Sequence, residues 1–405
     1  MRVRLLTAAA LLATAGCLSP IDPATTDIAA VQATIGDGGF AADTIQVRAT
    51  TRVHASALAA AGYDLGIAGF TYSSSNTAVA VVDENGTVRG IAPGSATITA
   101  TAPKGGRSAT VSVLVVPSTI AYTIAVGGSP GPIAFSTDYT RAYVATAEDS
   151  LVVVDALGFF RTNVAPIGNG ASGIAATTSA IYITHSALDS VSRVTTGSTQ
   201  PLSSVFVGAG PTGIVSVGAV AWVAARYDRR IAVVENGDVT GSILLAGEPH
   251  DLARDRDGAT LFATVDAGGG AWRVAVIHPA SGDTSASFPI APSPTAITAS
   301  AAGDRVYVLY ASEQLVRVYA SGGAGFALQG SVATGASPGG IAARHIGTVP
   351  YVVVSGEPAT VFDGVSLEVY DRITGAGTGP VAIRPDGLFA FVAAPGTTAV
   401  NVLGL

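Results

Sequence analysis

The sequence predicts an all-β chain of two domains, and three observations lead to that prediction. Its 405 residues are too many for one ordinary domain. The 49 glycines and 21 prolines imply many turns, and between them Val, Ile, Thr and Tyr alternate with small or polar residues, as in short strands. A motif also returns about every 40 residues along the C-terminal part of the chain. No helical periodicity follows the N-terminal leader.

The composition favours a folded, acidic protein and disfavours nucleic acid as a partner. Hydrophobic residues make up 48% and charged residues 12%, which supplies ample material for a core. The formal charge is −7, and removal of residues 1–16, which hold Arg2 and Arg4 and no acid, makes it −9. The chain has one lysine, Lys104, and no Lys/Arg cluster offers the basic face that phosphates require. Because Cys17 is the one cysteine, no disulfide can form within the chain.

The first 16 residues read as a secretory leader. Arg2 and Arg4 precede an apolar run at residues 5–15, which is shorter than the roughly 20 residues that a membrane span needs. Thr14, Ala15 and Gly16 then lead into Cys17, and this stretch resembles a bacterial lipobox, with Thr14 where the family usually has Leu. The resemblance implies cleavage before Cys17 and lipidation of that residue. The alternative is an ordinary signal peptide followed by an incidental cysteine.

Lipidation would hold the chain at a membrane surface. Leu18 follows the cysteine, and the absence of Asp there, which in Gram-negative lipoproteins favours inner-membrane retention, points to the outer membrane, facing the periplasm or the cell surface. Residues 17–26 comprise the lipidated cysteine and a tether without a strand pattern, of which residues 18–26 reach about 30 Å at most when extended.

Residues 27–116 are expected to form the first β-domain. In "FTYSSSNTAVAVVDENGTVRGIAPGSATITATAPKGGRSATVSVLVV", Asn85-Gly86 stands between alternating segments, which predicts a hairpin. Residues 70–116 resemble the bacterial immunoglobulin-like (Ig-like) domain of group 2, with Tyr72 where that family usually has Trp, and residues 27–69 resemble it weakly. The resemblance implies an Ig-like β-sandwich that serves as a spacer or an adhesive module.

Residues 118–405 contain seven repeats. Each begins with a branched apolar residue between small residues, the anchor of the repeat: Ile133, Ile174, Ile214, Leu252, Ile297, Ile341 and Val381. An aromatic residue follows each anchor: Tyr143, Tyr182, Trp222, Phe262, Tyr307, Tyr351 and Phe391. A valine of the third strand comes next: Val154, Val194, Val234, Val276, Val318, Val361 and Val402. Four short strands in a period near 40 predict the blade of a β-propeller.

The repeats "GPIAFSTDYTRAYVATAEDSLVVVDA" and "PVAIRPDGLFAFVAAPGTTAVNVL" resemble the YVTN-type propeller repeat. In the sixth repeat, the spacing from Ile341 to Val361 makes "ATVFD" the third strand and "LEVYDRI" the fourth. The fold class is therefore an N-terminal Ig-like β-sandwich followed by a seven-bladed β-propeller.

The seventh repeat holds three strands before Leu405, and "IAYTIAVGGSPGP" (120–132) supplies a spare one. We expect a strand at about 118–127 to complete the last blade and close the ring, which removes an open sheet edge.

Motifs of known chemistry do not occur in the sequence. The five histidines are isolated, and there is no HExxH, zinc pattern, P-loop or G-x-S-x-G elbow. "DRDG" (255–258) and "DENG" (83–86) lack the full calcium-loop spacing and read as turns. We therefore predict no catalytic residue and no bound cofactor, and calcium stays open as a weakly supported ligand.

One face of the propeller should gather charge. In propellers generally, ligands bind on the face with the loops between second and third strands and between consecutive blades. Here that face is expected to carry eight acids, three arginines and a histidine at its edge: Glu148, Asp149, Asp189, Arg226, Asp228, Arg229, Arg230, Glu248, His250, Asp266, Glu313 and Glu357. Such a face should attract cations or a basic partner, with "RYDRR" (226–230) as an exception. The alternative is a set of solvated loops.

Three functions stay open at this point. The first is a monomeric envelope lipoprotein whose propeller binds a protein or glycan. The second is an enzyme of lactonase or quinoprotein type, although the innermost strands are almost free of acids and amides, with Asp251 and Asp255 expected at most near the rim. The third is an assembly platform without a small ligand.

Overall fold

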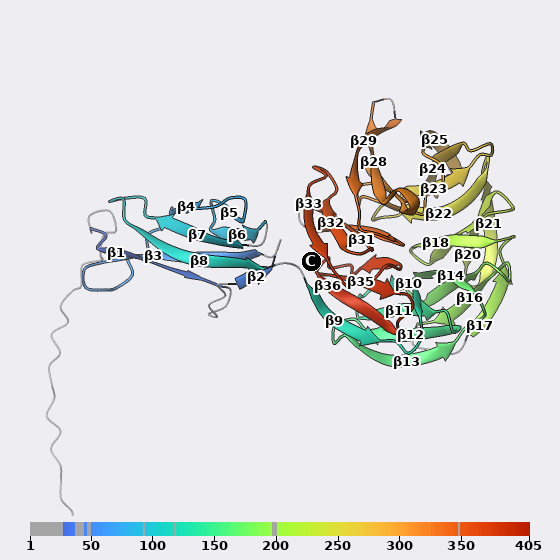
Figure 1. Cartoon of the computed structure of the whole chain (residues 1–405), viewed down its shortest axis with the longest axis horizontal. Coiled ribbons are helices and arrows are strands. Elements are labelled where there is room, and N and C mark those ends of the chain that lie inside the picture. Colours follow the sequence, from blue (N-terminus) through green and yellow to red (C-terminus); the bar gives the residue numbers. More distant parts are fainter. Residues whose placement is uncertain are drawn as a thin grey trace, which may run out of the picture. The chain divides into compact units, whose positions relative to one another are not determined.

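In the computed structural model, the described residues are 27–36, 44–46, 50–91, 94–116, 119–196, 201–323, 325–346 and 349–405. The leader and Cys17 lie outside them. The chain divides near residue 116 into two compact units, each of which is described by itself (Figure 1). None of the helices in the described part of the chain has the length and apolar character that crossing a bilayer takes.

The first unit is a β-sandwich of two four-stranded sheets, ordered β1-β3-β6-β5 and β2-β8-β7-β4 (Figure 1). Its strands are β1 (Ala30–Ile35), β2 (Thr44–Gln46), β3 (Thr50–Leu58), β4 (Thr71–Ser74), β5 (Ala80–Val82), β6 (Thr87–Gly90), β7 (Gly94–Thr101) and β8 (Ser108–Val116). Strand β7 alternates between buried and partly exposed residues, so its buried face packs toward the other sheet.

The hairpin predicted at Asn85-Gly86 joins β5 to β6. The Asp83 side chain accepts hydrogen bonds from the N–H groups of Asn85 (2.9 Å) and Thr87 (2.8 Å), so "DENG" is a turn held by its own carboxylate. Gly86 has a φ of 79°, and a Cβ there would lie 2.8 Å from the Val53 carbonyl oxygen. This position therefore requires glycine.

The second unit is a ring of seven four-stranded antiparallel sheets within residues 119–405 (Figure 1). The innermost strands are β10 (Pro130–Phe135), β14 (Ala171–Ala176), β18 (Pro211–Val217), β22 (Glu248–Arg254), β26 (Ala296–Ala299), β30 (Ile341–Ile346) and β34 (Val381–Ile383). The second strands are β11 (Arg141–Thr146), β15 (Ala180–His185), β19 (Val220–Ala225), β23 (Leu261–Asp266), β27 (Arg305–Tyr310), β31 (Val349–Val354) and β35 (Phe389–Ala394).

The third strands are β12 (Ser150–Asp155), β16 (Ser190–Thr195), β20 (Arg230–Glu235), β24 (Trp272–His278), β28 (Leu315–Gly322), β32 (Ala359–Asp363) and β36 (Ala399–Gly404). The outermost are β13 (Phe160–Pro166), β17 (Pro201–Phe206), β21 (Asp238–Leu244), β25 (Asp283–Ile290), β29 (Gly325–Ala333), β33 (Val369–Ile373) and β9 (Ile120–Ala125). A short 3-10 helix, η1 (Ala311–Glu313), joins β27 to β28.

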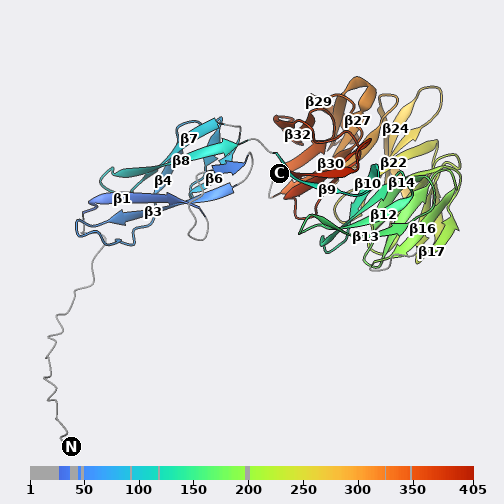
Figure 2. The same cartoon turned by 60° about the horizontal axis from the view of Figure 1, so that its bottom comes forward.

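The predicted register is confirmed in every blade. All seven anchors lie on innermost strands, all seven aromatic residues on second strands, and all seven valines on third strands. In the sixth blade, "ATVFD" is β32 and β33 follows it, as the spacing indicated. Figure 2 shows innermost strands such as β10, β14 and β22 toward the centre, with β13 and β17 at the periphery.

The ring closes with a strand from its N-terminal side, as predicted. Strand β9 pairs antiparallel with β36 and completes the seventh blade. Ile124 and Val126 are buried in a cluster that also contains Val144 of the first blade and Val400 of the seventh. Apolar packing between neighbouring blades therefore continues across the closure.

Candidate functional site

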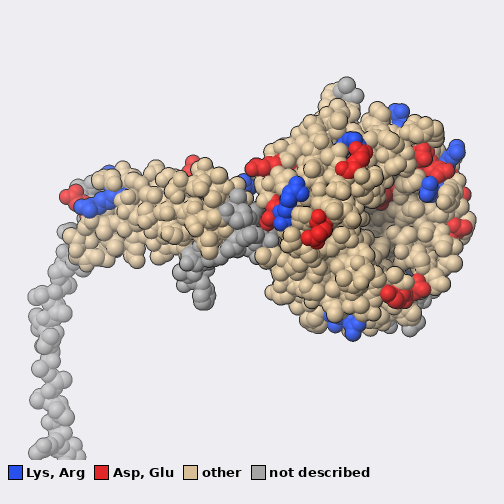
Figure 3. Space-filling model, in the orientation of Figure 1, with Lys and Arg blue, Asp and Glu red and all other residues tan. Residues whose placement is uncertain are grey.

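The predicted charged residues lie at one end of the ring, here called the mouth face. It is formed by the loops from second to third strands and by those that enter each next blade. Glu148, Asp149, Asp189, Arg226, Asp228, Arg229, Glu313 and Glu357 are in loops of the first kind or in η1, whereas Arg230, Glu248, His250 and Asp266 are at or near strand ends. Figure 3 shows acidic and basic side chains scattered in small groups around a hollow in the ring.

Two of the mouth-face acids accept hydrogen bonds from backbone N–H groups in the neighbouring loop. Asp149 accepts a hydrogen bond from the Gly170 N–H at 3.1 Å, and Asp189 accepts one from the Gly210 N–H at 2.8 Å. Both aspartates have positive φ angles, 56° and 52°, in the same position of successive blades. The pattern repeats because a left-handed residue at this point aims its carboxylate at the loop that enters the next blade.

Three further acids also accept backbone N–H groups. The Glu148 carboxylate accepts the N–H of Ser129 at 2.8 Å, and Glu357 accepts that of Gly375 at 2.9 Å. Asp266 accepts the N–H two residues further along its own loop at 2.8 Å. These side chains are therefore already engaged in holding the mouth-face loops.

The remaining three acids pair with arginines. The ion pairs are Arg226 Nε–Glu248 Oε2 (3.1 Å), Arg230 Nη2–Asp228 Oδ2 (3.3 Å) and Arg317 Nη2–Glu313 Oε2 (2.7 Å). Arg229 is exposed and makes no ion pair with a described residue. Among the described residues, no three His, Cys, Asp or Glu side chains are grouped so as to hold a metal ion.

The hollow at the mouth is a cavity of about 380 Å³ at the end of the central channel. All seven innermost strands or the residues just before them line it, and each contributes its apolar anchor together with small or polar neighbours. The polar side chains in its wall come from Ser172, Thr212, His250, Asp251 and Thr295. Asp251, expected at most near the rim, is therefore part of the channel wall. Asp255 instead caps the "DRDG" turn by accepting the N–H of Ala259 and of Thr260.

Asp251 braces two neighbouring blades. Its Oδ1 accepts the N–H of Leu252 at 2.8 Å, and its Oδ2 accepts the N–H of Ile297, in the next blade, at 3.0 Å. In the third blade the residue before the anchor is Gly213, where a Cβ would lie 2.7 Å from the Asp251 Cα. Asp251 holds the equivalent position in the fourth blade, where the hydrogen bond from the Ile297 N–H to its side chain takes the place of that close backbone contact.

The environment of the channel shifts the pKa of both titratable groups in its wall. Burial raises the pKa of Asp251 to about 6, although the two N–H donors oppose that shift. Burial, and then the positive charge of Arg226, lower the pKa of His250. The His250 ring lies 4.6 Å from that of Trp272, and its buried Nε2 has no hydrogen-bond partner among the described residues. Both Asp251 oxygens accept hydrogen bonds from backbone N–H groups. The side chain therefore stabilises the contact between the fourth and fifth blades, and the arrangement does not indicate a particular reaction.

The mouth face also exposes apolar side chains that the sequence reading did not single out. We define the rim patch as Leu188, Phe206, Tyr227 and Leu244 of the second and third blades, which are between 53% and 76% exposed. Phe206 and Leu244 end the adjoining outer strands β17 and β21 at the mouth face. The Arg226 guanidinium lies 5.1 Å from the centre of the Tyr227 ring. The tyrosine in "RYDRR" (226–230) is the feature of the sequence that could have indicated this patch.

Comparisons with known proteins support both folds. The model of the bacterial Ig-like domain (group 2) family matches residues 41–113. The chain is similar in structure to Kuenenia stuttgartiensis hydrazine synthase, with a TM-score of 0.59 and 21% identity over 68% of this chain and 96% of that chain. It is similar also to the β-propeller domain of Myceliophteria thermophila Cps50 (Swd1), with a TM-score of 0.58 and 10% identity over 69% and 98% of the two chains.

At these identities the structural likeness shows the propeller fold alone. No curated protein matches the sequence. The YVTN type of the repeats stays a prediction.

Proposed function

We propose that this chain is a cell-envelope lipoprotein, held at the outer membrane through Cys17, whose propeller binds a protein partner at its mouth face. In this proposal the Ig-like domain is a spacer between the anchor and the propeller. The anchor rests on the sequence: two arginines, an apolar run too short to span, and small residues directly before the one cysteine. One lipidated cysteine with several acyl chains makes a lasting anchor.

The rim patch is the observation that carries the binding role. Its four apolar side chains stand exposed on loops and strand ends that Asp189 and the Arg230–Asp228 pair hold in place. Exposed apolar groups on one face, with tyrosine and arginine among them, are typical of protein interfaces. The acids of the mouth face, by contrast, are engaged by backbone N–H groups or arginines, which favours a partner that recognises the apolar rim.

The anchor is tested with Cys17→Ser. We expect the wild-type chain to fractionate with the outer membrane and to incorporate labelled palmitate, whereas the variant loses the label and the membrane association. A Cys17→Ser protein that still fractionates with membranes, with an unlabelled wild type, would contradict lipid anchoring.

The binding role is tested by photocrosslinking in living cells. A crosslinking amino acid at Tyr227 should give one discrete adduct in the envelope. The matched control is Leu388, which is 51% exposed in the loop between first and second strands of the seventh blade, at the other end of the ring. Tyr227→Ala should weaken capture by a crosslinker at Phe206. The same adducts from Tyr227 and Leu388, or none from either, would refute a mouth-specific partner.

A further inference from the structure

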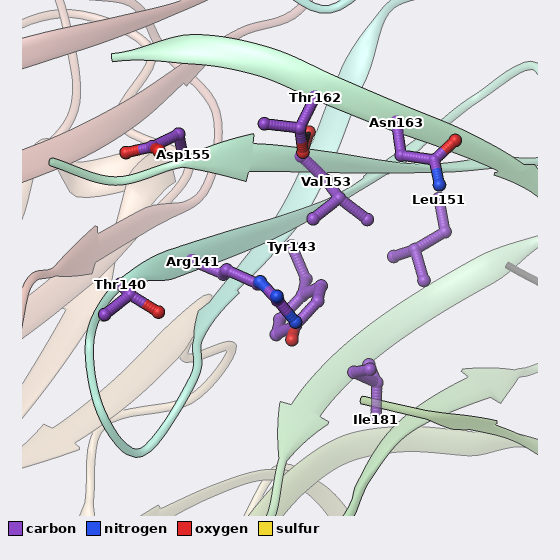
Figure 4. Close-up of a pocket in the computed structure, with 9 residues that line it drawn as sticks. All are labelled: Thr140, Arg141, Tyr143, Leu151, Val153, Asp155, Thr162, Asn163 and Ile181. Carbon is purple, nitrogen blue, oxygen red and sulfur yellow. Dashed lines mark hydrogen bonds between the residues drawn. The ribbon is translucent and has the colours of Figure 1, made fainter. Parts of the chain in front are cut away.

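A second cavity lies away from the mouth face, between the first and second blades. It has a volume of about 420 Å³, and strands β11, β12 and β13 of the first blade and β15 of the second contribute to its wall. Arg141 and Tyr143 line it and also line an adjacent cavity of about 210 Å³. Figure 4 shows the Arg141 guanidinium and the Tyr143 hydroxyl side by side in this space, here called the interblade cleft.

The Tyr143 hydroxyl is buried without a hydrogen bond. The residue is 2% exposed, and its hydroxyl has no hydrogen-bond partner among the described residues. Burial raises the pKa of this hydroxyl, and the adjacent Arg141 side chain opposes the shift, first by direct interaction with the hydroxyl and then by its charge. Tyr307 occupies the same position in the fifth blade, where its hydroxyl donates to the Gly364 carbonyl oxygen of the next blade at 3.2 Å. In the first blade the equivalent hydroxyl instead borders a cavity.

Arg141 likewise lacks the partner that its counterpart has. Arg305 begins the second strand of the fifth blade, as Arg141 does in the first, and it pairs with the preceding residue, Asp304. The residue before Arg141 is Thr140, which cannot form an ion pair. Arg141 makes no ion pair with a described residue.

Asp155 faces Arg141 across the sheet in register but does not neutralise it. Its Oδ1 accepts the N–H groups of Leu157 at 2.9 Å and Gly158 at 2.7 Å, which turns the carboxylate toward its own loop. In Figure 4 the Asp155 carboxylate lies apart from the Arg141 guanidinium. The cation is thus left facing the cleft.

The rest of the wall defines the kind of molecule that fits. Asn163 uses its Oδ1 to accept the N–H of Val164 at 2.8 Å, which leaves its amide N–H groups without a described partner. Val153, which is half-buried, supplies an apolar surface, and the buried Leu151 and Ile181 lie behind it. A cation, a hydroxyl and an amide together offer donors to a carboxylate and to hydroxyl oxygens, and an apolar wall suits the C–H face of a sugar ring.

We propose that the interblade cleft binds a small sugar acid, with Arg141 pairing with its carboxylate and the Tyr143 hydroxyl donating a hydrogen bond to it. The volume of the cleft fits a ligand of monosaccharide size. This site is separate from the mouth face and does not depend on the proposed function.

Calorimetric titration of the purified full chain with D-galacturonate and D-glucuronate tests the proposal. At least one should bind, and the neutral sugars galactose and glucose and the bare carboxylate acetate should bind at least about tenfold more weakly. Arg141→Gln should reduce the affinity for the uronate by about tenfold or more because the charge-assisted bond is lost. Tyr143→Phe should reduce it less and leave the melting temperature of the free protein unchanged.

The matched control is Tyr307→Phe, which removes the equivalent, bonded hydroxyl and should lower stability without changing uronate binding. Failure of both uronates to bind the wild type would overturn the proposal. So would unchanged affinity in Arg141→Gln. Equal binding of acetate would reduce the site to an adventitious anion contact and would also overturn it.

Discussion

Removal of the closing strand is the sharpest test of how the propeller is built. Deleting residues 118–127 takes away β9 and its pairing with β36, from Ala125 opposite Ala399 to Ile120 opposite Leu403. The seventh blade then ends in an unpaired edge, and the packing between the seventh and first blades loses its outer part. We expect the propeller to lose most of its stability.

The magnitude follows from the contacts of β9 and the residue after it. Ile124 and Val126 are each 2% exposed, and burying such side chains is worth about 1.5–3 kcal/mol each. Tyr122 stacks on Phe159 with the ring centres 4.2 Å apart, which adds about 1 kcal/mol. The Thr123 hydroxyl donates to Asn401 at 2.9 Å, which adds about 1 kcal/mol more. The loss of roughly 5–8 kcal/mol is comparable to the whole stability of many domains.

The assay is calorimetric unfolding of the full chain, in which the separate first unit serves as an internal reference. Ile124→Ala should destabilise the propeller by about 2–5 kcal/mol, because it leaves a cavity between two blades. Leu328→Ala, on the outer strand β29 with 57% exposure, should change stability by no more than about 0.5 kcal/mol. An unchanged melting temperature of the propeller after deletion of residues 118–127 would refute the closure.

Two further predictions concern the channel wall. Since the pKa of Asp251 is about 6 in the fold against 3.8 for a free aspartate, the folded state holds its proton longer, and stability should fall by at most about 3 kcal/mol as the pH rises from 4 to 6. Asp251→Asn should remove that part of the dependence in urea titrations across this range, and an identical pH profile would contradict the assignment. Gly213→Ala should cost about 1–3 kcal/mol in the same assay because its methyl group meets the next blade, whereas Gly241→Ala, with its nearest contact at 3.9 Å, should be close to neutral. Equal effects of the two would refute the packing argument.

The fold was predictable because its residues repeat. Each blade needs an anchor on the innermost strand, an aromatic residue on the second and a valine on the third, and the spacing between them survives even where the sequence between them diverges. In the sixth blade the distance from Ile341 to Val361 alone identified β32. The closing strand was predictable for the same reason, since a ring of such sheets leaves one strand position to fill.

The site was less predictable because it depends on the direction in which individual side chains point. The pairing of β22 with β23 shifts register between Pro249 and Asp251, so simple alternation does not tell which way Asp251 points. The sequence also presents Asp149 and Asp189 as free charges. That their carboxylates accept backbone N–H groups of the next loop follows from positive φ angles that the sequence does not display.

The blades act as internal controls for one another, and the candidate sites lie where a blade departs from the others. Tyr227 stands where the first two blades have Ala147 and Ala187, and it is the exposed ring of the rim patch. Arg141 follows Thr140, whereas its counterpart Arg305 follows an aspartate. Substitutions that restore the repeated residue, such as Tyr227→Ala, should therefore preserve the fold, because other blades already tolerate that residue there, while removing the chemistry specific to one position. A partner-binding role would be lost under such a change without loss of stability, whereas a residue needed by the fold would lower both together.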